Sequence, residues 1–185
     1  NFYGTTSSGG NLGLNSRLGY GTVFRLNPTG TLTTLVAFDG NNGAYPYSKL
    51  VLGNDGNFYG TTFNFGALPL KFGKGSGMMG SGTVFKVATD GTLTTLAWFV
   101  GENGANPYAG LTLGRDGNFY GTTQQGGNHG KGVVFKITTN GEFSVLASFP
   151  ARKEGATRCS LVQGKDGNFY GVTSSTLFRV ATDGG

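Results

Sequence analysis

The chain has 185 residues, of which 36 are glycine and only 12% are charged, and its net charge is +5 at neutral pH. Hydrophobic residues make up 37% and aromatic residues 13% of it, which excludes a disordered protein, because disorder goes with few apolar side chains and much net charge. The 5 prolines and the irregular glycine spacing exclude collagen. No apolar run is long enough to predict a membrane-spanning helix.

The chain is a tandem repeat. The motif Asn-Phe-Tyr-Gly begins at Asn1, Asn57, Asn118 and Asn168. A second motif with a central Val-Phe pair occupies Gly21–Arg25, Gly82–Lys86 and Gly132–Lys136. A period of 50–61 residues indicates a propeller, a solenoid or an array. We expect a single repeat domain over residues 1–185, with units 1–56, 57–117 and 118–167 and a partial unit 168–185.

Each unit contains four short stretches with the composition of strands. The best-preserved set covers residues 50–53, 57–62, 83–88 and 92–99, which are rich in Val, Thr, Phe, Tyr and Leu. Asp-Gly or Asn-Gly pairs predict tight hairpins between the first and second and between the third and fourth stretch, because glycine adopts positive φ without strain. Longer connections alternate with these hairpins. The pattern predicts an all-β, β-propeller-like array of four-stranded antiparallel blades, with tight turns on one face and long connections on the other.

The array is incomplete at both ends. It starts at a second strand, at Asn1, and stops after Asp183, where a fourth strand is due. We therefore expect four repeats with three, four, four and three strands. Unpaired sheet edges readily pair with other chains. This suggests either a piece of a longer chain or a unit that a neighbouring subunit completes.

Three motifs together resemble a known bacterial family. Asp-Gly-Asn-Phe-Tyr-Gly-Thr-Thr, Gly-Thr-Val-Phe-Lys and Thr-Asp-Gly-Thr-Leu-Thr-Thr-Leu are similar to the GloVer tandem repeat of bacterial "choice-of-anchor" proteins, over nearly the whole chain. Such proteins often carry a carboxy-terminal sorting signal, so the resemblance implies an extracellular or cell-surface location. It implies no catalytic residues.

The ionisable residues predict neither a catalytic nor a metal site. Five of the nine acids lie in tight turns as turn formers, and one carboxylate per turn is too few for calcium. His129 is the only histidine and Cys159 the only cysteine, so we expect no multi-histidine metal site, no internal disulfide and no cofactor. We interpret Cys159 as a buried structural thiol. If the chain is an enzyme, the candidate groups are His129, Glu102, Asp39 and Tyr20.

One basic residue recurs beside the third-strand Phe of every unit, at Arg25, Lys86, Lys136 and Arg179. We interpret these four as solvated side chains that discourage edge pairing. Nucleic-acid binding usually clusters basic residues with stacking aromatic ones, and the other basic residues here are scattered, so we do not expect nucleic acid as a partner.

The connection from the second to the third strand differs most between units. A uniform scaffold with variable loops on one face is typical of a recognition surface. Aromatic, amide and basic groups there suit a sugar or peptide ligand, and the apolar stretch 63–72 suits contact with another chain. The candidate binding residues are Arg17, Tyr20, Phe63, Phe65, Phe72, Gln124, Gln125 and His129.

We therefore expect an extracellular or cell-surface β-propeller repeat protein that acts as a binding or self-assembly module. Its partner would be a glycan, a protein or copies of itself. The alternative is an extracellular carbohydrate-active enzyme, a polysaccharide lyase or hydrolase, on a propeller scaffold.

Overall fold

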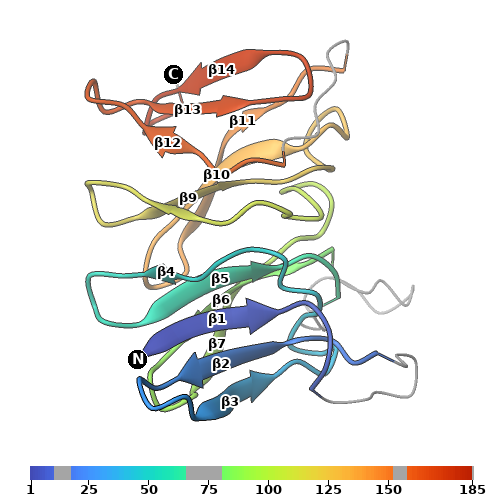
Figure 1. The fold of residues 1–185 in the computed structure, drawn as a ribbon. Coiled ribbons are helices and arrows are strands. Elements are labelled where there is room, and N and C mark those ends of the chain that lie inside the picture. Colours follow the sequence, from blue (N-terminus) through green and yellow to red (C-terminus); the bar gives the residue numbers. More distant parts are fainter. Residues whose placement is uncertain (11–17, 66–80, 152–157, 185) are drawn as a thin grey trace.

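The structure is a computed structural model that describes residues 1–10, 18–65, 81–151 and 158–184. These residues form four antiparallel sheets (Figure 1). None of them belongs to a helix that could cross a membrane. The all-β prediction is confirmed, and so is the count of three, four, four and three strands.

Each sheet is built from consecutive strands. The first sheet holds β1 (Phe2–Thr6), β2 (Thr22–Leu26) and β3 (Leu32–Ala37). The second holds β4 (Val51–Leu52), β5 (Phe58–Thr62), β6 (Thr83–Val87) and β7 (Leu93–Trp98). The third holds β8 (Thr112–Leu113), β9 (Phe119–Thr122), β10 (Val133–Ile137) and β11 (Phe143–Ser148). The fourth holds β12 (Val162–Gln163), β13 (Phe169–Val172) and β14 (Leu177–Val180).

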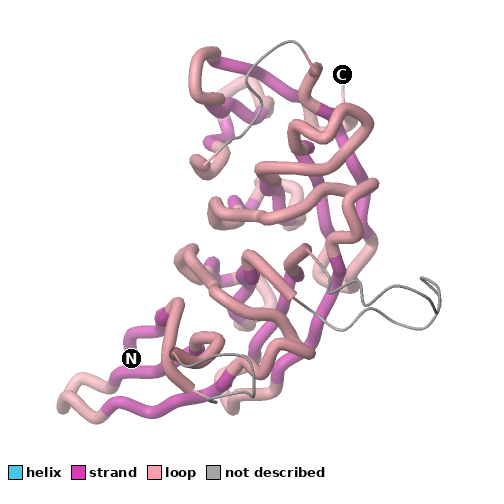
Figure 2. The backbone as a smooth tube through the Cα atoms, turned by 90° about the vertical axis from the view of Figure 1, so that its right-hand side faces the viewer, coloured by secondary structure: helices cyan, strands magenta, loops and turns pink. Residues whose placement is uncertain are grey.

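The sheets follow one another along a crescent, from the first at the bottom of Figure 1 to the fourth at the top, and Figure 2 shows its curvature from the side. Tight hairpins project on one side and long connections on the other, as the alternation of short and long connections predicts (Figure 1). The two-residue first strands β4, β8 and β12 converge, because residues of all three line one hollow. They form the inner edge of a propeller-like array.

The hairpins between first and second strands follow the predicted turn chemistry. Gly56, Gly117 and Gly167 have φ values of 78°, 79° and 86°, in the left-handed region that favours glycine. In each hairpin the preceding aspartate accepts a hydrogen bond from the hydroxyl of a tyrosine on the second strand, at 2.7 Å. The turn is thereby tied to the strand that follows it.

Aromatic pairs hold neighbouring sheets together, and the same two pairs recur at every sheet-to-sheet interface. A second-strand Tyr stacks on the second-strand Phe of the next unit, in Tyr3–Phe58, Tyr59–Phe119 and Tyr120–Phe169, at 4.2, 4.0 and 3.9 Å between ring centroids. A Phe that follows the fourth strand meets the third-strand Phe of the next unit edge-on, in Phe38–Phe85, Phe99–Phe135 and Phe149–Phe178, at 5.3, 5.3 and 5.1 Å. The core is therefore a series of similar interfaces, as in other repeat arrays.

Two side chains depart from the interpretations made from the sequence. Lys136 is not simply solvated, because its Nζ lies 3.2 Å from Asp116 Oδ2 and 5.7 Å from the centre of the Tyr120 ring. Cys159 is half-buried rather than buried, and its Sγ donates to the carbonyl of Val172 at 3.2 Å. In both cases the partner, Asp116 for Lys136 and Val172 for Cys159, is distant in the sequence, so the local sequence does not reveal the contact.

Candidate functional site

Partly exposed aromatic rings gather where the chain enters the first strands of the second and third sheets. Tyr47 lies just before β4 and Tyr108 just before β8, and their rings are 48% and 38% exposed, with centroids 5.3 Å apart. Phe63, just after β5, packs against both rings at 5.3 and 6.0 Å. Three rings from three connections thus form one aromatic surface.

Arg158 continues this surface toward the fourth sheet, and Gln124 is assigned to it by its place in the repeat. Arg158 occupies the position before β12 that Tyr108 occupies before β8. Its guanidinium lies 5.6 Å from the centre of the Tyr108 ring, within cation–π range. Gln124 and Phe63 occupy equivalent positions in the third and second units, because both directly follow the motif Phe-Tyr-Gly-Thr-Thr. We call Tyr47, Phe63, Tyr108, Gln124 and Arg158 the rim row.

Gln124 carries an unpaired donor into this row. Its side-chain nitrogen Nε2 is buried and has no hydrogen-bond partner among the described residues. Leaving a buried donor unpaired costs about 1–3 kcal/mol, so such groups usually meet water or a ligand. The row therefore combines apolar ring faces, a cation and one buried, unpaired donor.

A second group of aromatic residues supports the row from inside. Tyr20 is only 6% exposed, and its ring meets those of Phe65 and Tyr45 at 5.6 and 6.2 Å. Tyr45 in turn stacks on Tyr47 at 6.3 Å. Tyr45 and Phe65 have φ values of 59° and 62°, and such a conformation costs a bulky residue on the order of 1–3 kcal/mol and tends to occur at functional sites. The strain lies directly behind the exposed part of the row.

Two hollows lie close to the row. One of about 440 Å³ crosses the first strands and includes Lys49, Val51 and Leu161 in its lining, so it begins two residues after Tyr47. The other, of about 380 Å³, is lined by Arg158, Cys159, Val172, Thr173 and Ser174. The second hollow adjoins the row through Arg158, so a ligand on the row could reach into it.

The predicted binding residues divide into four groups. Phe63 and Gln124 belong to the rim row, whereas Tyr20 and Phe65 lie in the aromatic group behind it. Gln125 is exposed, and its backbone pairs with that of the preceding connection. His129 is exposed and shares no ring contact with the row. Arg17 and Phe72 lie outside the described residues.

Reasoning from the sequence missed Tyr47, Tyr108 and Arg158. A signal was present, because these three residues occupy the same place in successive units, each three residues before the leucine that opens the first-strand stretch. These three residues lie in the connections from a fourth strand to the next first strand, whereas the predicted binding residues all lie in the connections from a second to a third strand.

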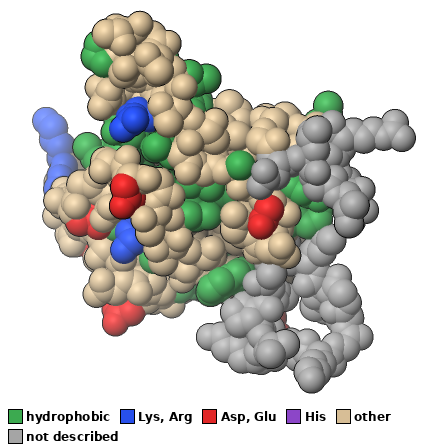
Figure 3. Space-filling view, turned by 90° about the horizontal axis from the view of Figure 1, so that it is seen from below, with side chains coloured by type: hydrophobic (Ala, Val, Ile, Leu, Met, Phe, Trp, Pro, Cys, Tyr) green, Lys and Arg blue, Asp and Glu red, His purple; other side chains and the backbone are tan. Residues whose placement is uncertain are grey.

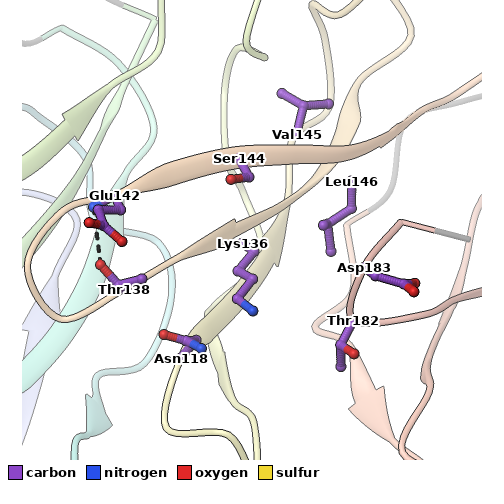
Figure 4. A pocket seen from close by; sticks show the side chains of 9 residues that line it. All are labelled: Asn118, Lys136, Thr138, Glu142, Ser144, Val145, Leu146, Thr182 and Asp183. Atoms are coloured by element: carbon purple, nitrogen blue, oxygen red, sulfur yellow. Dashed lines mark hydrogen bonds between the residues drawn. The ribbon is translucent and has the colours of Figure 1, made fainter.

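A third hollow, of about 380 Å³, lies on the opposite, tight-hairpin side between the third and fourth sheets (Figure 4). Lys136 and Glu142 line it, and the Glu142 backbone N–H donates to Thr138 Oγ1 at 3.1 Å. The charge of Lys136 is already paired with Asp116. Burial alone would raise the pKa of Asp116, but hydrogen bonds from Asn118 and Tyr120 and the contact with Lys136 outweigh it and lower that pKa to about 2. This hollow is less suited to binding an anion than the rim row.

The candidate catalytic acids have the surroundings of ordinary surface carboxylates. Asp39 caps a turn, since its Oδ1 accepts the backbone N–H groups of Asn41 and Asn42 at 2.9 and 3.0 Å, and Glu102 is exposed. Within the described ranges, no three residues among His, Cys, Asp and Glu form a group that could hold a metal ion.

Solved propeller structures resemble this chain in fold. Two proteins classed as candidate 6-phosphogluconolactonases, from Bacteroides uniformis and Bacteroides fragilis, superpose with TM-scores of 0.54 and 0.52 at 18% and 20% identity. Each match covers 97% of this chain, but only 50% and 48% of theirs. A gluconolactonase from Xanthomonas campestris gives 0.52 at 16% identity, covering 88% of this chain and 52% of its own.

This chain therefore spans about half the length of the solved structures that it matches, and at these identities the likeness establishes the fold alone. No curated protein matches it in sequence. The Gloeobacter/Verrucomicrobia repeat matches residues 1–179, which is nearly the whole chain and confirms the resemblance seen in its motifs. The chain belongs to the Gloeobacter/Verrucomicrobia repeat family.

Proposed function

We propose that this chain is a binding module that holds an acidic glycan along the rim row. The observation that carries the proposal is the contact series Tyr47–Tyr108–Arg158, in which two partly exposed rings are followed by a guanidinium, at 5.3 and 5.6 Å. Successive repeats supply these groups. A linear ligand with repeated sugar units could thus meet similar chemistry at successive blades.

The chemistry of the row suits a sugar carboxylate. Ring faces such as those of Tyr47 and Tyr108 pack against the apolar C–H face of a sugar ring and bury its surface. A guanidinium binds a carboxylate through two parallel hydrogen bonds, and Arg158 is placed to do so. Lys49, exposed in the adjoining hollow, and the net charge of +5 favour an anionic ligand further.

We place the module outside the cell or at the cell surface as part of the same proposal. The support is the resemblance to anchored surface proteins that the repeat motifs carry, together with the family match over residues 1–179. Protease shaving of intact cells tests the location. Release of this repeat by protease supports it, and full protection in intact cells with release only after lysis contradicts it.

Binding is tested by titrating the protein with oligogalacturonate, an oligomer of acidic sugars, and with neutral cello-oligosaccharide as the comparison. We expect saturable binding of the acidic oligomer that weakens as salt rises, since screening reduces the attraction of Arg158 and Lys49. Tyr108→Ala should weaken binding at least about tenfold, which corresponds to about 1.4 kcal/mol. Tyr108→Phe keeps the ring and should bind nearly as well as the unchanged protein.

The enzyme alternative, a polysaccharide lyase or hydrolase, is tested on the same samples. Formation of unsaturated or reducing-end products that is lost in His129→Ala would favour a lyase or hydrolase. Binding without turnover favours the module. Equal binding by Tyr108→Ala, Arg158→Ala and the unchanged protein would contradict the rim-row proposal.

A further inference from the structure

Two strained aromatic residues behind the rim row have counterparts one repeat later. Phe65 and Gly126 are equivalent, because each is the third residue after the motif Phe-Tyr-Gly-Thr-Thr and its carbonyl accepts the N–H of the glycine before the third strand. Tyr45 and Asn106 are equivalent, because each directly precedes the proline of its connection. All four have positive φ, of 62° and 81° in the first pair and 59° and 57° in the second.

The two junctions between units therefore meet the same backbone requirement with different residues. Glycine and asparagine adopt positive φ readily, whereas phenylalanine and tyrosine do so only under strain. The junction of units one and two, which we call the first junction, carries the two bulky residues. The second junction, of units two and three, carries the two that suit the backbone. Strain of this kind persists only where the surroundings hold it, and it tends to occur at functional sites.

The strained residues join their rings to that of Tyr20. The Tyr45 and Phe65 rings lie 6.1 Å apart, and the Tyr20 ring meets them at 6.2 and 5.6 Å. Tyr20 and Ser81 are again equivalent, since each directly precedes the glycine of the third-strand motif. We call Tyr20, Tyr45 and Phe65 the aromatic trio. Viewed from the end of the first sheet, the molecule shows hydrophobic side chains among scattered charged ones (Figure 3), so ring contacts suit this part of it.

The aromatic trio reaches the rim row through Tyr45. The Tyr45 ring stacks on the Tyr47 ring, with centroids 6.3 Å apart and planes inclined by 14°. The Tyr45 backbone is fixed on both sides, because its N–H donates to the Tyr20 carbonyl at 2.8 Å and its carbonyl accepts the Phe63 N–H at 3.1 Å. The ring behind Tyr47 is therefore itself held in place.

The second junction is held by hydrogen bonds at the equivalent position. Asn106 Nδ2 donates to the Phe63 carbonyl at 3.1 Å and to Asn64 Oδ1 at 2.7 Å. Tyr108, which follows in that connection, meets the rings of Tyr47 and Phe63. The orientation of Tyr108 thus depends on Tyr47, and the aromatic trio supports Tyr47.

We propose that Tyr45 and Phe65 are positioning residues, which hold the Tyr47 ring in one orientation so that a ligand meets the rim row already ordered. This inference rests on the binding proposed above for the rim row. A side chain that is ordered before binding removes part of the entropy loss of association. The strain at Tyr45 and Phe65 accompanies the placement of two rings where the next repeat has asparagine and glycine.

The second junction supplies the variant that tests this role. Tyr45→Asn combined with Phe65→Gly gives the first junction the residues of the second, so the backbone should be retained. Relief of strain offsets the lost ring contacts, and the melting temperature should change little. Oligogalacturonate binding should weaken about three- to tenfold, as expected when one side chain must be ordered on binding. Phe65→Tyr keeps a ring and should bind like the unchanged protein.

Ile137→Ala is the control for a general loss of stability. Ile137 is fully buried at the end of β10, beside a tight hairpin and so on the side opposite the rim row. This variant should lower the melting temperature but leave binding unchanged. If it weakens binding as much as the double variant does, binding follows stability alone and the proposal is overturned.

A second measurement needs no ligand. Fluorotyrosine incorporated in place of Tyr47 reports the surroundings of this ring by fluorine NMR. We expect the signal in the double variant to move toward that of free fluorotyrosine, because the ring is no longer held. If the unchanged protein does not bind oligogalacturonate, the proposed function fails and the fluorine signal alone decides the role of Tyr45 and Phe65. The same spectrum in both proteins overturns the inference, and so does equal binding by both.

Discussion

At the scale of single residues, one carboxylate organises each hairpin between a first and a second strand. Asp116 accepts hydrogen bonds of 2.8 Å from Asn118 Nδ2 and 2.7 Å from the Tyr120 hydroxyl, both on its Oδ2. Burial alone would raise the pKa of Asp116, but these bonds and Lys136 lower it to about 2. Burial and the hydrogen bond to Asp116 raise the pKa of Tyr120.

We expect Asp116→Asn to lower the free energy of unfolding at pH 7 by about 1 kcal/mol, a value discounted for the partial exposure of the carboxylate. The folded pKa lies below the ordinary value of 3.8, so the contribution of the carboxylate is complete above about pH 4 and disappears as the pH falls toward 2. Urea unfolding at pH 7 and near pH 2 checks this. The difference between variant and unchanged protein should shrink at the lower pH, and an equal difference at both would contradict it.

At the scale of the strand, a glycine in each second strand makes room for the third-strand phenylalanine. A Cβ atom on Gly121 would lie 2.5 Å from Phe135 Cζ, and one on Gly4 would lie 2.6 Å from Phe24 Cζ. The two sites are locally alike. They differ in the surroundings of the ring, because Phe135 is fully buried between sheets and Phe24 is only partly buried.

Gly121→Ala should therefore destabilise the protein by roughly 1–3 kcal/mol, because the Phe135 ring has no free space to move into. Gly4→Ala should cost clearly less, because the Phe24 ring can tilt outward. Thermal unfolding of the two variants compares them directly. A larger loss of stability from Gly4→Ala than from Gly121→Ala would disprove the packing argument.

At the scale of the whole molecule, each sheet is stabilised mainly by its neighbours, so stability should vary along the crescent. Among the described residues, the third sheet has a neighbouring sheet on both faces, whereas the first has one on a single face. In the chain of 185 residues, amides of β9 and β10 should exchange with deuterium at least about tenfold more slowly than those of β1 and β2. Mass spectrometry of exchanged peptides measures this, and uniform protection of all four sheets would show that the array unfolds only as a whole.

Local sequence was sufficient for much of this fold. The Asp-Gly hairpins, the third-strand motif with its central Val-Phe pair and the spacing of the repeats predicted the strands to within a few residues, because turn chemistry and strand composition act between close neighbours. The first strands were predicted over residues 50–53, but β4 covers only Val51–Leu52. Its length depends on pairing with β5, which the local pattern does not specify.

The candidate site was only partly predictable. Phe63 and Gln124 stood out because they lie in connections that vary between units, but their partners Tyr47, Tyr108 and Arg158 are separated by about a full repeat. Sequence by itself determined that the chain repeats, that it is all-β and where its turns fall, since these follow from residues close together in the chain. Only the stacking of the sheets in the tertiary structure brings equivalent positions of successive units into contact. This contact places Tyr47, Tyr108 and Arg158 next to one another in one row.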